Sequence, residues 1–303
     1  MKHQTTVAAL PLFQPGDRIR LIAPSGPVPA ERFAQGVACL REWELEPVYE
    51  PEILSRETYL AGSDARRLAE LQAALADRDA RAIWGARGGY GAARLLSGVT
   101  PAQVGKQVLL GFSDLSALHA LWHRAGRGSV HACNLSGLGE WEAADRLALY
   151  EGLFRGSWPS LQGQTALGRG CVQGPIMGGN LTVFAALAGT GFLPDLRGAI
   201  VFLEDVAERP YRLDRSLTQL LQTGVLQDVA AVAIGQLTKC EDPPGKEQGR
   251  SALDVMVDVL APLNVPILTG LRIGHERSAL PLPFGVDMVL DADAGVLRCA
   301  AAA

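Results

Sequence analysis

The chain has 303 residues, of which 48% are hydrophobic and 20% charged, a composition that supports a sizeable globular core. Its formal charge of -4 excludes the basic surplus typical of nucleic-acid-binding proteins. The five cysteines are scattered without a C-x-x-C pair, which argues against a disulfide framework or a cysteine zinc site. Because residues 1–13 show no signal-peptide pattern and no run is long enough to span a membrane, we expect a cytoplasmic protein.

The first half of the chain alternates strand and helix patterns. Apolar runs closed by turn residues predict strands, and spacings of three and four residues predict helices. The predicted strands cover 18–24, 80–86 and 107–112, and the predicted helices cover 29–44, a segment capped by Ser63, a segment starting near Ala92, and 115–124. Strands that alternate with helices predict βαβ units and a parallel sheet.

The pattern changes after residues 158–174, which are rich in Gly and Gln and are interpreted as a linker. We therefore expect an N-terminal α/β domain over 1–160 and a C-terminal domain over 170–303. In the second half the predicted strands cover 198–206 and 229–237, and the predicted helices cover 211–222 and 251–260. A polar loop over 240–250 separates the last of these strands from the last helix, and a hairpin turning at 293–295 is predicted to end the chain.

Two predicted strand ends carry small residues suited to contact with a ligand. Glycines at 88, 89 and 91 would let backbone N–H groups approach a ligand, or would simply form a tight turn. Ser113 lies between a buried strand and a helix, which is the position of a nucleophile elbow, although the match to G-x-S-x-G is incomplete. A helix cap is the competing interpretation of Ser113.

Other polar residues stand out further along the chain. Glu204 and Asp205 end a strongly apolar strand, and His275 lies in a loop after another predicted strand. His119 and His123 are four residues apart on one helix, a spacing that suits a metal, but without a convincing third ligand a packed or solvated face is expected. We therefore expect neither a metal nor an organic cofactor.

A serine, a histidine and a carboxylate have a joint chemical meaning. A serine hydroxyl is a weak nucleophile until a base takes its proton, and the base needs a carboxylate that fixes its tautomer and stabilises its charged form. Ser113, Glu204 and His275 supply these three groups in that order along the chain. Order alone is weak evidence, because triads occur in several orders.

Five segments together resemble the LD-carboxypeptidases, in the serine peptidase group that also contains the microcin C immunity peptidase. They are IAPSGPV, IWGARGGYGAARLL, LLGFSDLSALH, the pair GGNLTVFAALAGT and FLEDVAERPYRLDR, and IGHERSALPLPFG. The resemblance implies a flavodoxin-like or amidotransferase-like N-terminal domain and a smaller mixed α/β C-terminal domain. It also implies an active site between the two domains, in a homodimer. The nucleophile falls on Ser113, the other triad members on Glu204 and His275, and the oxyanion-hole amides on Gly89 and Asp114.

The resemblance further implies a small peptide substrate, a murein tetrapeptide from cell-wall recycling that loses its terminal D-alanine. Arg87, Arg209 and Arg212 are candidates for binding the terminal carboxylate, and surface ion pairs are the alternative for each. The chain departs from the family at His131-Ala132-Cys133, where His-Gly-Pro is common, and this departure leaves details of the pocket open.

Two other functions remain open at this stage. The first is a microcin-type immunity peptidase or another amide hydrolase of the same family. An immunity peptidase would need aromatic rings to stack on a base, for which Trp141 and Trp158 are candidates. A two-domain binding protein without catalysis would need no serine nucleophile and would normally carry an export signal. We expect no nucleic-acid or membrane partner.

Overall fold

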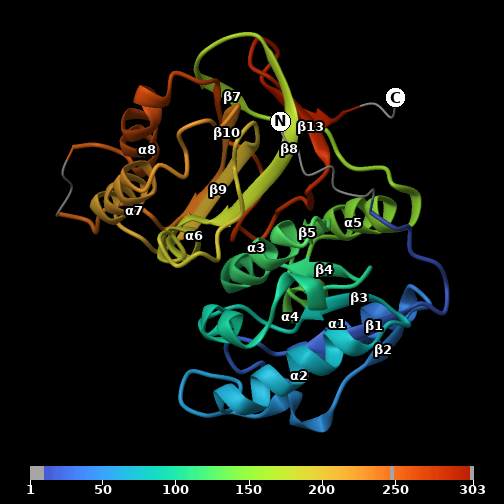
Figure 1. The fold of residues 1–303 in the computed structure, drawn as a ribbon. Coiled ribbons are helices and arrows are strands. Elements are labelled where there is room, and N and C mark those ends of the chain that lie inside the picture. The colour runs from blue at the N-terminus through green and yellow to red at the C-terminus, as the bar shows by residue number, and fades with distance from the viewer. Residues whose placement is uncertain (1–9, 246–248, 301–303) are drawn as a thin grey trace. The chain divides into compact units, whose positions relative to one another are not determined.

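The computed structural model describes residues 10–245 and 249–300. The chain divides into two compact units, which Figure 1 shows as ribbons. Of the described residues, the first unit holds 10–158 and 281–285, and the second holds 159–245, 249–280 and 286–300. The expected mixed α/β fold is confirmed, because each unit contains a β-sheet covered by helices.

The first unit is built on a six-stranded sheet in the order β12-β5-β4-β3-β1-β2. Strands β1 to β5 pair in parallel, as predicted, and β12 pairs antiparallel with β5. The strands are β1 (Arg18–Ile22), β2 (Glu46–Val48), β3 (Ala80–Gly85), β4 (Val108–Gly111), β5 (Ser129–His131) and β12 (Leu282–Phe284). The order 2-1-3-4-5 of the parallel strands is that of flavodoxin-like sheets, which bind ligands at the carboxyl ends of the strands near β1 and β3.

Helices of the first unit form where the sequence places apolar residues on one face. In α2 the Ser63 hydroxyl caps the helix by accepting from the Arg66 N–H at 3.2 Å, as predicted, and Leu71 and Leu75 are buried. The α-helices are α1 (Ala30–Glu42), α2 (Asp64–Ala76), α3 (Ser116–Arg124), α4 (Leu135–Leu138) and α5 (Ala143–Arg155).

The helix predicted near Ala92 is instead a short 3-10 helix, η2 (Ala92–Gly98). This segment ends at Gly98 and Pro101 lies three residues further on, so it is too short for the apolar periodicity of an α-helix to develop. The other 3-10 helices of the first unit are η1 (Pro51–Leu54), η3 (Pro101–Gln103) and η4 (Ser113–Leu115).

The second unit is built on an eight-stranded mixed sheet in the order β6-β14-β13-β8-β9-β10-β11-β7. Its strands are β6 (Leu161–Gln162), β7 (Gln164–Leu167), β8 (Cys171–Asn180), β9 (Ile200–Val206), β10 (Ala231–Thr238), β11 (Ile267–Thr269), β13 (Asp287–Asp291) and β14 (Val296–Cys299). The predicted C-terminal hairpin is confirmed as the antiparallel pair β13–β14. The segment 158–174, interpreted as a linker, is largely strand, because β6, β7 and the start of β8 pair with β14, β11 and β13 of the sheet.

Three α-helices cover β9 and β10 in Figure 1. They are α6 (Leu181–Ala186), α7 (Pro210–Gln222) and α8 (Ala252–Leu260), and the 3-10 helix η5 (Ala261–Leu263) follows α8. The packing face of α7 consists of Leu213, Leu217 and Leu220, spaced by four and three residues and fully buried.

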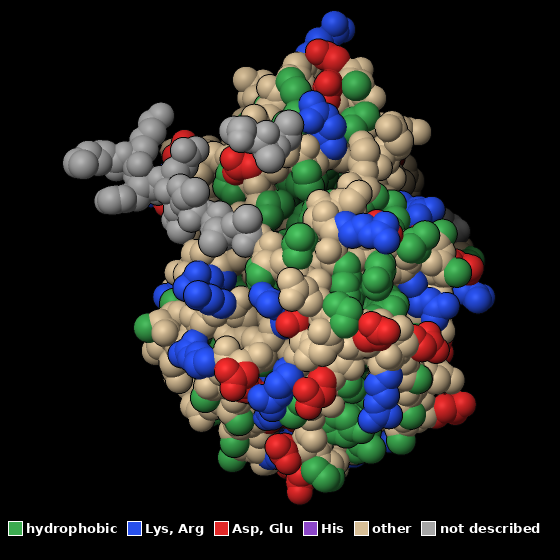
Figure 2. All heavy atoms as spheres, turned by 90° about the vertical axis from the view of Figure 1, so that its right-hand side faces the viewer, with side chains coloured by type: hydrophobic (Ala, Val, Ile, Leu, Met, Phe, Trp, Pro, Cys, Tyr) green, Lys and Arg blue, Asp and Glu red, His purple; other side chains and the backbone are tan. Residues whose placement is uncertain are grey.

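Charged side chains of both signs are interspersed on the face of the molecule in Figure 2, in keeping with 28 basic and 32 acidic residues. Across residues 10–245 and 249–300, no helix is both long and apolar enough to cross a bilayer. Two segments of the sequence analysis lie partly outside the described residues. They are the N-terminal segment without a signal-peptide pattern, at positions 1–9, and the polar loop, at positions 246–248.

Candidate active site

Ser113 follows β4 in a backbone conformation that few residues other than glycine adopt. Its φ is +64°, which costs a non-glycine residue about 1–3 kcal/mol unless the surrounding structure enforces it. A sharp turn of this kind between a strand and a helix is the geometry of a nucleophile elbow. The competing interpretation as a helix cap is not supported, because α3 and η4 begin without any side-chain cap hydrogen bond.

Gly88 leaves room for this serine. A methyl group at Gly88 would lie 3.0 Å from Cβ and 3.1 Å from Oγ of Ser113, closer than side chains normally approach. The next residue, Gly89, has a φ of +111° and is the predicted first donor of the oxyanion hole. Since β3 and β4 are parallel neighbours, the glycine loop and the serine both follow the carboxyl ends of their strands, on the same side of the sheet.

The Asp114 side chain connects the serine turn to two other loops. Its carboxylate is buried and accepts hydrogen bonds from the Ser25 hydroxyl at 2.6 Å and from the Ala92 N–H at 2.8 Å. Burial raises the pKa of this carboxyl, and these hydrogen bonds oppose the rise. Three of the segments that carry the family resemblance therefore meet at one carboxylate, namely those that contain Ser25, Gly89 and Ser113.

His119 and His123 belong to the core of the first unit. His119 donates from Nε2 to the Gly111 carbonyl at 2.9 Å, so its Nδ1 accepts from the Ser129 hydroxyl at 2.7 Å. Burial lowers the pKa of His119 to about 4 and that of His123 to about 3. Within the described residues no group of three or more His, Cys, Asp or Glu side chains is arranged to hold a metal.

The His131-Ala132-Cys133 segment also lies in this core. All three residues are buried, and the His131 ring centroid is 5.4 Å from that of Phe284 in β12. Phe284 also contacts the rings of His119 and His123, at 5.2 Å and 5.7 Å. The departure from the family pattern at His131-Ala132-Cys133 therefore changes residues that pack in the interior of the first unit.

Glu204 and His275 meet in the second unit although 70 residues separate them in the chain. Oε2 of Glu204 lies 2.7 Å from Nδ1 of His275, and the carboxylate is fully buried while the imidazole is 15% exposed. Burial raises the pKa of Glu204, and the hydrogen bond from His275 opposes the rise. With Nδ1 donating to the carboxylate, Nε2 is the nitrogen that can take a proton.

The loop that carries His275 is fixed by its neighbours. The Gln236 amide donates to the Ser278 carbonyl and accepts from the Glu276 N–H, both at 3.0 Å. Gly274 has a φ of +145°, and a methyl group there would lie 3.2 Å from Oε2 of Glu204. Only glycine therefore lets the loop approach the carboxylate so closely.

Sequence reasoning did not assign Asn180 and Thr182, which bind Asp205, the residue after Glu204 in β9. Asn180, in the GGNLT segment, caps α6 by accepting from the Val183 N–H at 3.1 Å and donates to Asp205 at 3.0 Å. Asp205 also accepts from the N–H and hydroxyl of Thr182 at 2.9 and 2.8 Å. The signal that could have found them is the GGN turn at the end of β8, since β8 and β9 are parallel and Asn180 pairs in register with Glu204.

The three candidate arginines differ in their contacts. Arg87, beside the glycine loop of the first unit, donates to the Pro27 carbonyl at 2.6 Å. Arg212 lies 3.4 Å from Glu208 and 3.2 Å from the Tyr211 hydroxyl, as in the surface ion pair considered for it. Arg209 precedes α7 at its N-cap position.

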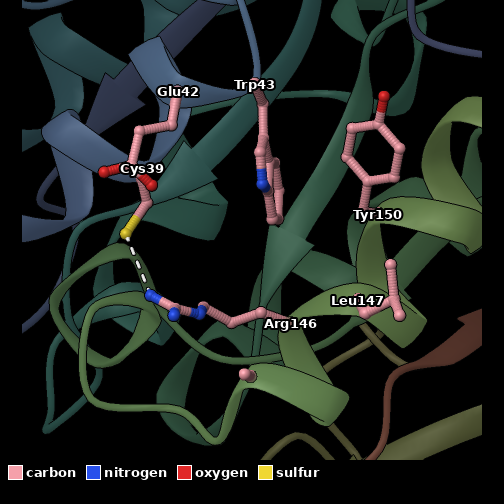
Figure 3. Close-up of a pocket in the computed structure, with 7 residues that line it drawn as sticks. Cys39, Glu42, Trp43, Arg146, Leu147 and Tyr150 are labelled. Carbon is pink, nitrogen blue, oxygen red and sulfur yellow. Dashed lines mark hydrogen bonds between the residues drawn. The ribbon is translucent and has the colours of Figure 1, made fainter.

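A separate cavity of about 390 Å³ lies between α1 and α5 of the first unit. Figure 3 shows Trp43, Tyr150 and Arg146 around it, with a 3.6 Å contact from Arg146 to the Cys39 sulfur. The cavity contains none of the predicted site residues, and no reaction is assigned to it.

Comparison with known proteins shows the family to which this chain belongs. Family models of the LD-carboxypeptidase N-terminal domain and C-terminal domain match residues 19–132 and 173–290. A putative carboxypeptidase of Streptomyces coelicolor is 41% identical over 294 residues, which cover 93% of both chains. The murein tetrapeptide carboxypeptidase of Pseudomonas aeruginosa is 34% identical over 92% of this chain and 95% of its own.

The solved structure of the microcin C7 self-immunity protein superposes with a TM-score of 0.84 over 98% of this chain and 99% of its own. At 21% identity this likeness shows a shared fold. The two family models, by contrast, match most of the sequence and carry the same family name for both parts. This chain therefore belongs to the LD-carboxypeptidase family of peptidases.

Proposed function

We propose that the protein is a serine carboxypeptidase that hydrolyses the L,D-amide bond of a murein tetrapeptide and releases its terminal D-alanine. The observation that carries the proposal is the 2.7 Å pair of Glu204 and His275, a buried carboxylate that orients a partly exposed imidazole. Ser113, at the elbow after β4, is the proposed nucleophile. The name of the 34% identical relative from Pseudomonas aeruginosa supports the substrate class.

In this mechanism Nε2 of His275 takes the proton of the Ser113 hydroxyl as Oγ attacks the scissile carbonyl carbon. Negative charge develops on the carbonyl oxygen and is stabilised by the N–H groups of Gly89 and Asp114. The imidazolium, stabilised by Glu204, then protonates the amine of D-alanine as the C–N bond breaks. Water, deprotonated by the same imidazole, hydrolyses the acyl-enzyme, and the proton returns to the serine. Besides the substrate and one water molecule, the proposed chemistry uses only side chains and backbone N–H groups of this chain.

Chain connectivity supports the encounter of Ser113 with His275. Only six residues separate His275 from Leu282, the first residue of β12, which belongs to the sheet that carries Ser113. In this sheet Leu282 of β12 pairs with His131 of β5, and His131 pairs with Gly111 of β4. Gly111 lies two residues before Ser113. The proposed base is therefore tethered by a short loop to the sheet of the proposed nucleophile.

An arginine is the proposed partner of the terminal carboxylate. Arg87 directly precedes the glycine loop, whereas Arg212 already pairs with Glu208. A carboxylate fixed by Arg87 and a carbonyl fixed at Gly89 would together define the configuration at the terminal carbon. Inversion of that carbon would unpair a charge and cost about 2–5 kcal/mol, so a D-alanine peptide should be preferred by roughly thirtyfold to several thousandfold.

Mass spectrometry tests the proposal directly. The purified protein is incubated with L-Ala-γ-D-Glu-meso-diaminopimelate-D-Ala, with the isomer that ends in L-alanine, and with an aminoacyl-sulfamoyl adenosine. We expect loss of one alanine from the first peptide and much slower cleavage of the second. Equal kcat/KM for the two peptides, or cleavage of the nucleotide analogue alone, would overturn the proposal. A cytoplasmic location and a homodimer are parts of the same proposal.

An immunity-type peptidase is the second candidate, favoured by the fold shared with the microcin C7 self-immunity protein. The two tryptophans considered for base stacking, Trp141 and Trp158, are partly buried and pack against the core of the first unit. Trp158 lies over Gly152, where a methyl group would come within 2.4 Å of its ring. These contacts favour a packing role for both rings.

A further inference from the structure

A fully buried arginine on α2, Arg67, lies beneath the loops of the proposed oxyanion hole. Its side chain is 0% exposed, and its guanidinium donates to the carbonyls of Pro24, Gly91 and Gly62 and to the carboxylate of Asp64. The bonds to Gly91 and Gly62 measure 3.0 and 3.3 Å. A planar guanidinium with five donors can bridge several carbonyls in this way, which the compact ammonium of lysine cannot reproduce.

Arg67 and Asp114 hold the two ends of one peptide group. The carbonyl of the Gly91–Ala92 peptide accepts from Arg67, and the N–H of the same peptide donates to Asp114 at 2.8 Å. Rotation of that peptide plane would break both charge-assisted hydrogen bonds, which are stronger than neutral ones. The glycine loop that contains Gly89 is therefore fixed two residues beyond Gly89.

The same two side chains hold the loop after β1. Arg67 binds the Pro24 carbonyl, and Asp114 accepts from the hydroxyl of the next residue, Ser25, at 2.6 Å. The following residue, Gly26, donates its N–H to the Gly88 carbonyl at 3.0 Å. The β1 loop thus supports the glycine loop from the other side, one residue before Gly89.

The charges of the pair also complement each other. Asp114 would place a buried negative charge next to the oxyanion that forms during acyl transfer, which disfavours the reaction unless a cation offsets it. Burial raises the pKa of Asp114, and the electrostatic interaction with Arg67, together with the hydrogen bonds from Ser25 and Ala92, opposes that rise. Asp64, the carboxylate on the other side of Arg67, is 43% exposed and therefore more strongly screened by solvent.

We propose that Arg67 and the carboxylate of Asp114 are positioning residues, which together hold the Gly89 and Asp114 N–H groups where the oxyanion develops. The inference rests on the proposed function, and it adds a side-chain role for Asp114 and a role for Arg67. Because these groups act on the transition state and do not contact the substrate, their loss lowers kcat and leaves KM nearly unchanged.

The test compares Asp114→Asn, Arg67→Lys and Ser25→Ala with the wild type on the murein tetrapeptide. We expect kcat to fall about 10-fold to about 100-fold for the first two, since a misplacement of about 1 Å costs roughly that much. Ser25→Ala removes one donor of two and should have a smaller effect in the same direction. A phosphonate analogue, which mimics the tetrahedral anion, should lose affinity in parallel with kcat. Substrate binding, measured in the Ser113→Ala background, should not change.

The Asp17–Arg81 pair provides the matched control. Nε of Arg81 lies 2.9 Å from Asp17, at the amino ends of β1 and β3, away from the edge that carries Ser113. Asp17→Asn and Arg81→Lys make the same two side-chain changes at a pair outside the proposed site, and both should keep the wild-type kcat.

Four outcomes decide the inference. The inference would be overturned by a wild-type kcat in both Asp114→Asn and Ser25→Ala. It would also be overturned if these variants changed only KM, or if the variants of the control pair lost as much kcat. If Asp114→Asn or Arg67→Lys does not fold, Ser25→Ala carries the decision alone. An inactive wild type would overturn the proposed function and the inference with it, whereas an active wild type with unaffected variants overturns the inference only.

Discussion

Substitution of Gly274 by alanine tests whether the loop geometry before His275 controls activity. The new methyl group would lie 2.9 Å from Cβ of Gln236 and 3.2 Å from Oε2 of Glu204, and the φ of +145° would be strained for alanine. Such backbone conformations cost about 1–3 kcal/mol. The loop can relieve this strain only by moving away from Gln236 and Glu204, which would lengthen the 2.7 Å bond to His275.

If that free energy is lost from the transition state, kcat/KM for release of D-alanine should fall about fivefold to about 150-fold. Gly270→Ala is the control, because Gly270 also has a positive φ, of +71°, but no described atom beyond its two chain neighbours lies within 4 Å of the added methyl group. Both variants should lower the free energy of unfolding, measured in urea, but only Gly274→Ala should lower kcat/KM. Equal kcat/KM in the two variants would refute the link between this loop and catalysis.

Three further predictions concern the triad, metals and acid. Ser113→Ala and His275→Ala should each remove most activity, and the double substitution should cost no more than either alone; Glu204→Gln should be milder, because the carboxylate orients the base and does not attack. Near-normal turnover in Ser113→Ala would show that the nucleophile is another residue. Dialysis against EDTA should leave kcat unchanged, and a loss that zinc restores would return His119 and His123 to consideration as ligands. These two histidines have folded-state pKa values of about 4 and about 3, below the ordinary 6.5, so the unfolded chain binds protons first. The free energy of unfolding should therefore fall as the pH drops below about 6.5 and keep falling to about pH 3, and His123→Phe should reduce that dependence in urea titrations at pH 7, 5.5 and 4.

Much of the fold could be predicted from hydrophobic patterns. Buried strands such as β3, β4 and β9 and amphipathic helices such as α2 and α7 have long, regular signals, and the structure contains them close to the predicted bounds. The three-residue strands β2, β5, β11 and β12 have no such signal, because they are too short to show alternation and are stabilised by their neighbours in the sheet. Strand order is a tertiary property, so the patterns could not choose between a flavodoxin-like and an amidotransferase-like sheet.

The candidate site was less accessible to sequence reasoning. The position of Ser113 at a strand end was visible, but its positive φ depends on space provided by Gly88 from another loop. The pairing of Glu204 with His275 joins residues far apart in the chain, and apart from the family resemblance only the general chemistry of a triad linked them beforehand. The buried donors that hold Asp114 lie in two further loops, so no local pattern could indicate them.

The return of the chain into the first unit at residues 281–285 has a consequence for synthesis on the ribosome. Residues 10–158 contain every other element of that unit, yet β5 has no partner on its outer side until β12 has been made. From the synthesis of β5 until that of β12, therefore, the nascent first unit exposes an open sheet edge at Ser129–His131. Growing chains should be most prone to aggregation during this interval, and a gene fragment that stops after the first unit should inherit the same weakness.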